Sequence, residues 1–460
     1  MTALLCALLS GAMFYLSQGQ DDVWWLAWFA PVPPLWLAYG PAKGWHVFVV
    51  SLAANACGQI YMVQTYGGAM PIPAMAVMMF GWGALFAAAV LFAQTIWQKP
   101  SPGAALLAFP AAWTAIEYGV SLISPHGSWG ALGYSQVSFP AAIQIASLFG
   151  LYAITFTLCL FANALALIAR GAWKAALPGL VATALVMVFG WAHLAQTQGE
   201  TVHAALLADW DQRVKSVKKL DFAASRAVAE QYAQAAREEA EKGARFIVIP
   251  ESALVADPAW RNEALAPLAQ VARESNATIV AGVVLVKPWR NAAFSFLPDG
   301  SQKSYDKRHL LLPGEGKFKP GPGPGPLGNG RSVAICKDLD FPGTLRSDAQ
   351  ADIRLMAVPA NDFVKDGWIH ARMAVMRGVE NGFAIARSAF NGVETVSDAQ
   401  GRVLARASTV QPGMVRLSAD VPLGPGPTFY TRIGDVFAWA CVALALGLAA
   451  MLLGKRHEPV

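Results

Sequence analysis

Charged side chains are scarce in this chain of 460 residues, because Asp, Glu, Lys and Arg together make up only 14% of it. A typical soluble protein carries about 25%. Hydrophobic residues make up 55%, so the composition excludes a disordered, a fibrous or an ordinary cytosolic protein. The net charge of +5 at pH 7 comes from interspersed residues of both signs, and nothing in it favours binding to nucleic acid.

The scarcity of charge is confined to one part of the chain. Residues 1–198 contain seven charged side chains, whereas residues 199–434 contain 54. This contrast predicts a polytopic α-helical membrane domain over 1–198, a water-exposed domain over 199–434, and a last span with a short tail over 435–460. Apolar stretches near the ~20 residues that cross a bilayer predict eight spans, at 3–18, 23–40, 45–63, 73–97, 103–123, 139–168, 175–196 and 435–454.

Lysine and arginine are absent from three of the connections between these spans, at 19–22, 64–72 and 124–138. The alternate connections and the tail contain Lys43, Lys99, Arg170, Lys174, Lys455 and Arg456. Because basic residues accumulate in cytoplasmic loops, we expect both termini in the cytoplasm. Seven crossings then place residues 199–434 outside, in the periplasm if the cell is Gram-negative.

The 199–434 segment has a single cysteine, Cys336, since the other four fall within predicted spans. A disulfide within this domain is therefore excluded, and no spacing of Cys and His suggests a zinc site. Cys336 is either a core thiol or a nucleophile at the turn after a predicted strand over 332–335. His309 and His370 stand alone and are expected to be structural.

Strand and helix signals alternate in the same domain. Buried strands are predicted over 202–207, 246–250 and 278–285, and amphipathic helices over 223–242 and 258–275. This alternation predicts layers of sheet and helix.

A nucleophilic thiol needs a base for its proton and positive charge beside the developing anion. Glu251 stands at the carboxyl end of a predicted strand, and Lys307 lies eight residues before Glu315 across a Pro/Gly turn. Taken singly, each would be a solvated surface charge. The order Glu251, Lys307, Cys336, with separations of 56 and 29 residues, is much more specific.

That order, together with the sequence motifs around it, resembles the nitrilase (carbon–nitrogen hydrolase) superfamily. The matching motifs include Asn361–Asp362, His370, and the segments 377–382 and 398–401. The resemblance implies an αββα sandwich in which Glu251 is the general base, Lys307 the oxyanion stabiliser and Cys336 the acyl-accepting nucleophile. Further active-site candidates are Glu315, Asp338, Asn361 and Asp362. No metal or organic cofactor is implied.

The membrane part resembles one branch of that superfamily, the apolipoprotein N-acyltransferase family. The matching sequence motifs lie at 29–31, 66–68, 113–117, 129, 133–136 and 430–435. The resemblance implies a bacterial inner-membrane enzyme that takes an acyl chain from a phospholipid, usually phosphatidylethanolamine, as a Cys336 thioester. The acyl chain then passes to the α-amine of a diacylglyceryl-cysteine lipoprotein. We expect a monomer.

The chain departs from the family at the nucleophile, where Cys336–Lys337–Asp338 replaces the usual Cys-Tyr-Glu. This leaves an alternative, a membrane-tethered amidase or an acyltransferase for a different amine. A third reading is a non-catalytic protein that binds lipid or a partner, and the intact Glu251, Lys307 and Cys336 weigh against it.

Four further residues are candidates for substrate or lipid contact. Glu117 in a predicted span is costly in lipid, so it is either functional or a helix-packing hydrogen bond. Trp129 and Tyr134 either line a lipid entry or belong to the aromatic belt of the membrane interface. Trp210 stands where the family often has a Gln-Gly-Asn run.

Overall fold

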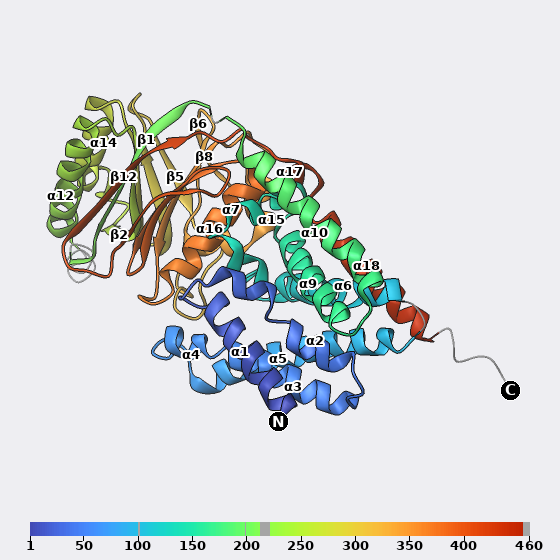
Figure 1. Cartoon of the computed structure of the whole chain (residues 1–460). Coiled ribbons are helices and arrows are strands. Elements are labelled where there is room, and N and C mark those ends of the chain that lie inside the picture. Colours follow the sequence, from blue (N-terminus) through green and yellow to red (C-terminus); the bar gives the residue numbers. More distant parts are fainter. Residues whose placement is uncertain (100–101, 198, 212–220, 454–460) are drawn as a thin grey trace. The chain divides into compact units, whose positions relative to one another are not determined.

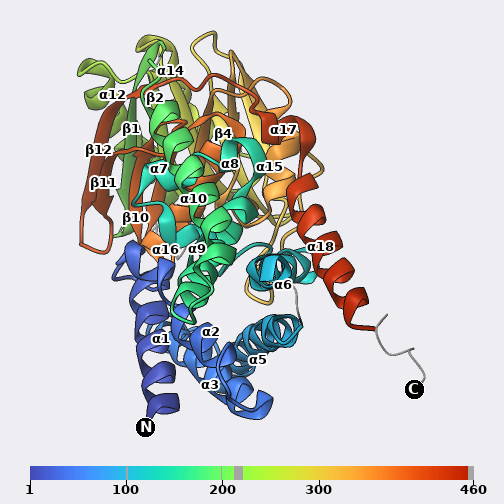
Figure 2. The same ribbon diagram turned by 45° about the vertical axis from the view of Figure 1, so that its right-hand side comes forward.

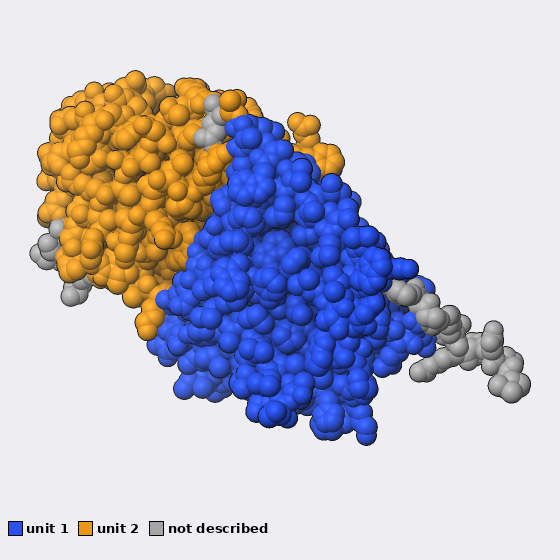
Figure 3. Space-filling model, viewed as in Figure 1, with its two compact units in different colours: residues 1–196, 433–460 blue, residues 197–432 orange. Residues whose placement is uncertain are grey.

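The computed structural model describes residues 1–460 except 100–101, 198, 212–220 and 454–460 (Figure 1). The chain forms two compact units, residues 1–196 with 433–460, and residues 197–432 (Figure 3). Within the described residues, the first unit is helical, and the second contains two sheets with helices. Lys455 and Arg456, which contribute to the predicted orientation, lie outside the described residues.

Among the described residues of the first unit, five helices are long and apolar enough to cross a membrane. They comprise α3 (Gly44–Gly58) continuing through α4 (Tyr61–Tyr66), α5 (Ile72–Trp97), α6 (Pro102–Ile123), α9 (Leu151–Ile168) and α10 (Trp173–Leu194). Shorter apolar helices are α1 (Thr2–Gln18), the segment Pro140–Phe149, and α18 (Val436–Leu453). The chain is a membrane protein, with five helices of crossing length where the sequence predicts eight spans.

Two of the predicted spans are broken. The stretch 23–40 consists of a short 3-10 helix, η1 (Trp24–Trp28), and α2 (Val32–Ala38). Prolines at 31, 33 and 34 explain the break, since proline fits only the first turn of a helix and disrupts its interior. The stretch 139–168 divides into α7 (Pro140–Ile143), α8 (Ala146–Phe149) and α9, with a left-handed Gly150 (φ +77°) before α9.

The orientation of the chain can be tested with reporters. Because three connections lack basic residues, a reporter fused after Gly199 should be active outside the cytoplasm, and one fused after Arg456 inside it. Paired alkaline phosphatase and fluorescent-protein fusions would measure this. The opposite result at either site would contradict the predicted orientation.

The second unit contains two six-stranded sheets (Figures 1 and 2). The first has the order β12 (Met414–Pro422), β1 (Thr201–Asp209), β2 (Phe246–Ala256), β3 (Thr278–Leu285), β4 (Arg290–Phe296) and β5 (Gln302–Asp306). The second has the order β11 (Val403–Ser408), β10 (Val393–Ser397), β9 (Ala384–Phe390), β8 (Leu355–Asn361), β7 (Arg331–Val333) and β6 (Gly325–Gly328). Strands β1, β2 and β3 are mutually parallel, as are β7, β8 and β9.

The two sheets share one apolar core, to which Leu206 and Val248 of the first sheet and Val333 and Ala357 of the second contribute fully buried side chains. Helices α12 (Phe222–Glu241) and α14 (Ala266–Glu274) pack on the first sheet. Helices α15 (Pro342–Ala349) and α16 (Gly367–Asn381) lie beside the second. The parallel strands are buried on both faces, which explains their nearly continuous apolar sequences.

Local signals account for the helices. Asp221 caps α12 by accepting a hydrogen bond from the Ala224 N–H at 2.7 Å, as expected of an N-cap aspartate. The predicted helix over 258–275 is two helices, α13 (Arg261–Ala264) and α14. Pro267 lies in the first turn of α14, the position in which a helix accepts proline.

Candidate active site

The three residues predicted as a catalytic triad come together from three strands or from the turns that follow them. Glu251 lies in β2, Lys307 directly follows β5, and Cys336 opens the 3-10 helix η3 (Cys336–Asp340) after β7. Glu251 and Lys307 are buried, and Cys336 is partly exposed. The Lys307 Nζ atom lies 2.8 Å from Glu251 Oε1, and both charges act on the Cys336 thiol.

A bulge in β2 aims the Glu251 side chain. The pairing of β2 with β3 is interrupted between Ile249 and Leu254, and such bulges often re-aim a side chain next to an active site. Gly282 of β3 makes the bulge possible, because a Cβ atom there would lie 2.2 Å from the Pro250 carbonyl oxygen. Any other residue at 282 would push the Glu251 backbone away.

The Cys336 backbone is strained, with a φ of +42°. A non-glycine residue in this left-handed region costs of order 1–3 kcal/mol, and such residues cluster at functional sites. The resulting sharp turn presents the thiol at the end of the strand, as a nucleophile elbow does. The Cys336 Sγ atom lies 3.8 Å from the carbonyl oxygen of Asn361 at the end of β8.

Asn291 and Glu315 complete the polar cluster around Lys307. The Lys307 Nζ atom lies 2.9 Å from Glu315 Oε2. Asn291 Nδ2 donates to Glu251 Oε1 at 2.6 Å and to Glu315 Oε1 at 2.7 Å. The Leu311 N–H also donates to Glu315, at 2.6 Å. The sequence alone does not identify Asn291, because β4, which carries it, has no clear strand pattern.

The protonation states suit base-assisted attack by a thiol. Burial raises the pKa of Glu251, although the Lys307 charge opposes the rise. Burial also raises the pKa of Cys336 well above its ordinary value. Burial lowers the pKa of Lys307, but the charges of Glu251 and Glu315 and the hydrogen bond to Glu251 together with the neighbouring Cys336 outweigh burial, so the pKa is raised. The raised pKa values favour a neutral thiol at Cys336 and an ammonium group at Lys307, and they make the Glu251 carboxylate a stronger base.

Asp338 ties the nucleophile turn to the segment after Lys307. Its side chain is fully buried and accepts four hydrogen bonds, from Tyr305 Oη at 2.6 Å, His309 N at 2.8 Å, Ile335 N at 3.0 Å and Arg308 N at 3.1 Å. Asp338 is thus a positioning residue for both Cys336 and Lys307.

Replacing Asp338 with asparagine should destabilise the protein by roughly 2–4 kcal/mol, because the amide NH₂ group would face donors that need an acceptor. It should also slow formation of any covalent adduct at Cys336. Thermal unfolding of the full chain in detergent measures the first effect. Asp420→Asn on β12, where the side chain is 74% exposed, is the matched control. An unchanged melting temperature in the Asp338 variant would contradict the positioning role.

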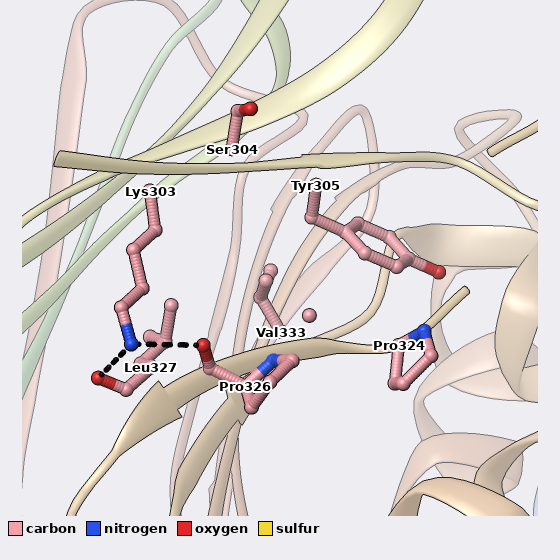
Figure 4. Close-up of a pocket in the computed structure, with 8 residues that line it drawn as sticks. Lys303, Ser304, Tyr305, Pro324, Pro326, Leu327 and Val333 are labelled. Carbon is pink, nitrogen blue, oxygen red and sulfur yellow. Dashed lines mark hydrogen bonds between the residues drawn. The ribbon is translucent and has the colours of Figure 1, made fainter. Parts of the chain in front are cut away.

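Tyr305 also borders a cavity of about 320 Å³ between β5 and β6 (Figure 4). Lys303 crosses one end of this cavity and donates to the carbonyl oxygens of Pro326 and Leu327, at 3.3 and 3.0 Å. Glu251, Lys307 and Cys336 do not line it. The cavity therefore adjoins the residues that position the site rather than the reacting atoms.

The Lys337 charge is not directed at the thiol. Lys337 Nζ lies 3.1 Å from Asp340 Oδ2, three residues along η3. Asp340 is 4.0 Å from His370, which also pairs with Asp366 at 3.1 Å. Burial lowers the pKa of His370, but the charge and hydrogen bond of Asp366, together with the charges of Asp340 and Asp362, raise it to about 9. Asp340 and Asp366 therefore balance the charges of Lys337 and His370.

Asp362 holds a second cation near the thiol. Its carboxylate pairs with the Arg387 guanidinium through two hydrogen bonds, of 2.5 and 3.1 Å, a geometry that favours strong binding. The Arg387 charge lowers the pKa of Cys336, in opposition to burial. Arg387 therefore belongs to the group of charged residues around the Cys336 thiol. Among the described residues, no group of His, Cys, Asp and Glu is arranged to hold a metal ion.

The candidates for lipid contact are divided between the two units. Trp210 follows β1 and packs edge-on against Phe390, with 5.7 Å between ring centroids. In the helical unit, Glu117 is buried and accepts hydrogen bonds from Leu132 N at 2.9 Å and Thr155 Oγ1 at 2.8 Å. Glu117 therefore joins α6 to η2 (Leu132–Gln136) and α9, as in the helix-packing alternative.

The two aromatic candidates also lie in the helical unit. Tyr134 is buried, and its hydroxyl lies 2.6 Å from that of Ser128. The Trp129 ring packs against Tyr66, with 5.8 Å between ring centroids.

Comparisons with known proteins agree over nearly the whole length. Residues 10–165 match the apolipoprotein N-acyltransferase N-terminal domain, and residues 197–424 match the carbon-nitrogen hydrolase family. The chain is 29% identical to an apolipoprotein N-acyltransferase of Geobacter metallireducens, over 98% of this chain and 95% of that protein. It is 27% identical to one of Shewanella oneidensis, over 94% and 92%. A nitrilase-superfamily amidase from Nesterenkonia is 21% identical with a TM-score of 0.41, covering 54% of this chain and 98% of that one.

Proposed function

The chain belongs to the apolipoprotein N-acyltransferase family, and from this premise we propose that it acylates lipoproteins through a thioester at Cys336. It is an acyltransferase. The donor in the proposal is a phospholipid, with phosphatidylethanolamine as the usual one, and the acceptor is the N-terminal amine of a diacylglyceryl-cysteine lipoprotein. The observation that carries the proposal is the direct contact of Lys307 with Glu251, at 2.8 Å, beside the strained Cys336.

The first half-reaction would form the thioester. Glu251 takes the proton of the Cys336 thiol, and Sγ attacks the carbonyl carbon of the phospholipid ester. The Lys307 ammonium stabilises the negative charge that develops on the carbonyl oxygen. The bond from this carbon to the glycerol oxygen then breaks, and that oxygen takes the proton back from Glu251. A lysophospholipid leaves.

The second half-reaction would form the amide. Glu251 removes a proton from the α-ammonium of the acceptor, and the freed amine attacks the thioester carbonyl while Lys307 again stabilises the oxyanion. As the C–S bond breaks, the attacking nitrogen gives its second proton to the sulfur, which regenerates the thiol, and Glu251 releases the first proton to solvent. The raised pKa of Glu251 supports both steps, because a base whose pKa lies nearer to the working pH transfers protons more effectively.

The proposal includes a location and an architecture. The chain would lie in the bacterial inner membrane with eight spans and both termini in the cytoplasm, and residues 199–434 would form an αββα sandwich outside. A thioester intermediate suits two substrates that are both anchored in one membrane, since the acyl group stays bound to the enzyme after the donor leaves and until the acceptor binds. The chain would work as a monomer.

The proposed reaction is tested with the purified full chain in neutral detergent. After incubation with phosphatidylethanolamine, the Cys336 peptide should carry a hydroxylamine-labile acyl group, detected by mass spectrometry. A diacylglyceryl-cysteine peptide should discharge it as an amide. Failure of this discharge, together with hydrolysis of simple amides, would favour the amidase alternative.

A further inference from the structure

Three exposed lysines surround Trp289 at the margin of the site, and we call Lys287, Lys317 and Lys319 the basic patch. Lys287 lies in the turn between β3 and β4, and the other two follow Glu315. Lys317 Nζ sits 3.9 Å from the centre of the Trp289 ring. The Lys319 N–H donates to the Trp289 carbonyl oxygen at 3.2 Å. Lys317 and Lys319 are therefore held against the turn that carries Lys287.

The basic patch is joined to the catalytic carboxylates by short connections. Trp289 is two residues from Asn291, whose amide donates to both Glu251 and Glu315. Phe318 packs on Trp289, with 6.3 Å between ring centroids, and its N–H donates to the Glu315 carbonyl oxygen at 2.9 Å. The patch therefore borders the end of the site that Glu315 occupies.

The charge of the basic patch is not balanced locally. Among the residues that the structure describes, no carboxylate lies within 4.0 Å of any of its three ammonium groups. Residues 286–290 and 311–323 contain one acid, Glu315, and this acid pairs with Lys307. Arg290 is already paired with Asp306 at 2.5 Å. Three positive charges are left facing solvent, where they attract anions.

We propose that the basic patch binds the phosphate of the donor phospholipid, so that it selects the donor for the Cys336 reaction. Lysine is a compact charge that suits phosphate oxygens, and each lysine near anionic lipid changes binding by about fivefold. This inference rests on the proposed acyl transfer. It implies that a neutral diacylglycerol with the same acyl chains is a poor donor.

The experiment compares three donors with identical acyl chains in neutral detergent, namely phosphatidylethanolamine, phosphatidylglycerol and diacylglycerol. The readout is the rate of Cys336 acylation at increasing donor concentration, for the full-length chain. The test variant is Lys287→Gln with Lys317→Gln and Lys319→Gln. Two controls accompany it. One has the same three positions changed to arginine, and the other combines Arg226→Gln and Arg237→Gln on α12 with Lys242→Gln directly after it.

The wild type should acylate Cys336 more efficiently with phosphatidylglycerol than with diacylglycerol. In the glutamine variant this preference should fall at least tenfold, because the KM for phosphatidylglycerol rises while kcat stays nearly unchanged. Added salt should reduce the preference of the wild type, and both controls should retain it. An unchanged preference in the glutamine variant would overturn the inference. Inhibition of the wild type by inorganic phosphate, at constant ionic strength and at concentrations as low as the KM for the lipid, would assign the patch to free phosphate and also overturn the inference. If the wild type forms no Cys336 adduct with any donor, it is the proposed function that fails.

Discussion

Replacing Cys336 with alanine should reduce acyl transfer to the background rate, a loss of at least about a thousandfold, because the variant has no group to hold the acyl chain. Cys336 is the sole cysteine of residues 197–432, so no neighbouring thiol can replace it. The rate of amide formation on a diacylglyceryl-cysteine peptide measures the loss, and thermal unfolding shows whether the fold persists.

The matched control for this variant is Cys57→Ala, since Cys57 is an exposed cysteine of the helical unit. The control should keep its activity and still carry the acyl group at Cys336. Transfer at a normal rate by the Cys336 variant would refute the nucleophile assignment.

Replacing Glu251 with glutamine should slow thioester formation by about 10²–10⁴-fold, because glutamine cannot take the thiol proton. The wild-type rate should fall as the pH is lowered through the raised pKa of Glu251, since only the carboxylate is a base. The glutamine variant should lose this acidic limb. Rates of Cys336 acylation across the pH range measure both effects.

Glu315→Gln separates the two acids. Glu315 also contacts Lys307, at 2.9 Å, so its loss should lower the rate by weakening the hold on Lys307. The acidic limb set by Glu251 should remain in this variant. If Glu315→Gln removes the limb and Glu251→Gln retains it, the base has been assigned to the wrong carboxylate.

The catalytic roles of Glu251, Lys307 and Cys336 could be predicted from the sequence. Glu251 follows an apolar run, Lys307 precedes a Pro/Gly turn, and Cys336 is the single cysteine of its domain. Asn291 was not, because β4 contains few branched apolar residues and its role depends on pairing with β3 and β5. The contribution of Arg387 depends on where Asp362 lies in the folded unit. Asn291 and Arg387 contact residues from distant parts of the chain, so no short sequence motif identifies them.

The contacts of Lys337 could not be predicted from the sequence either, although this residue is next to Cys336. Its place next to Cys336 suggests a cation beside the thiol, but the 3-10 geometry of η3 brings its ammonium to Asp340. In the helical unit, hydropathy marked the apolar stretches correctly and was insensitive to where they break. The prolines before and within α2 and the left-handed Gly150 set those breaks.

The most direct test of the proposed function is mass spectrometry of lipoprotein N-termini in bacteria whose own acyltransferase has been replaced by this chain. The proposal predicts an amide-linked acyl chain on the N-terminal diacylglyceryl-cysteine when the wild-type chain is present, and a free amine when the Cys336→Ala variant is present at an equal level in the membrane. Free N-terminal amines in cells that contain the wild-type chain in their membrane would contradict it.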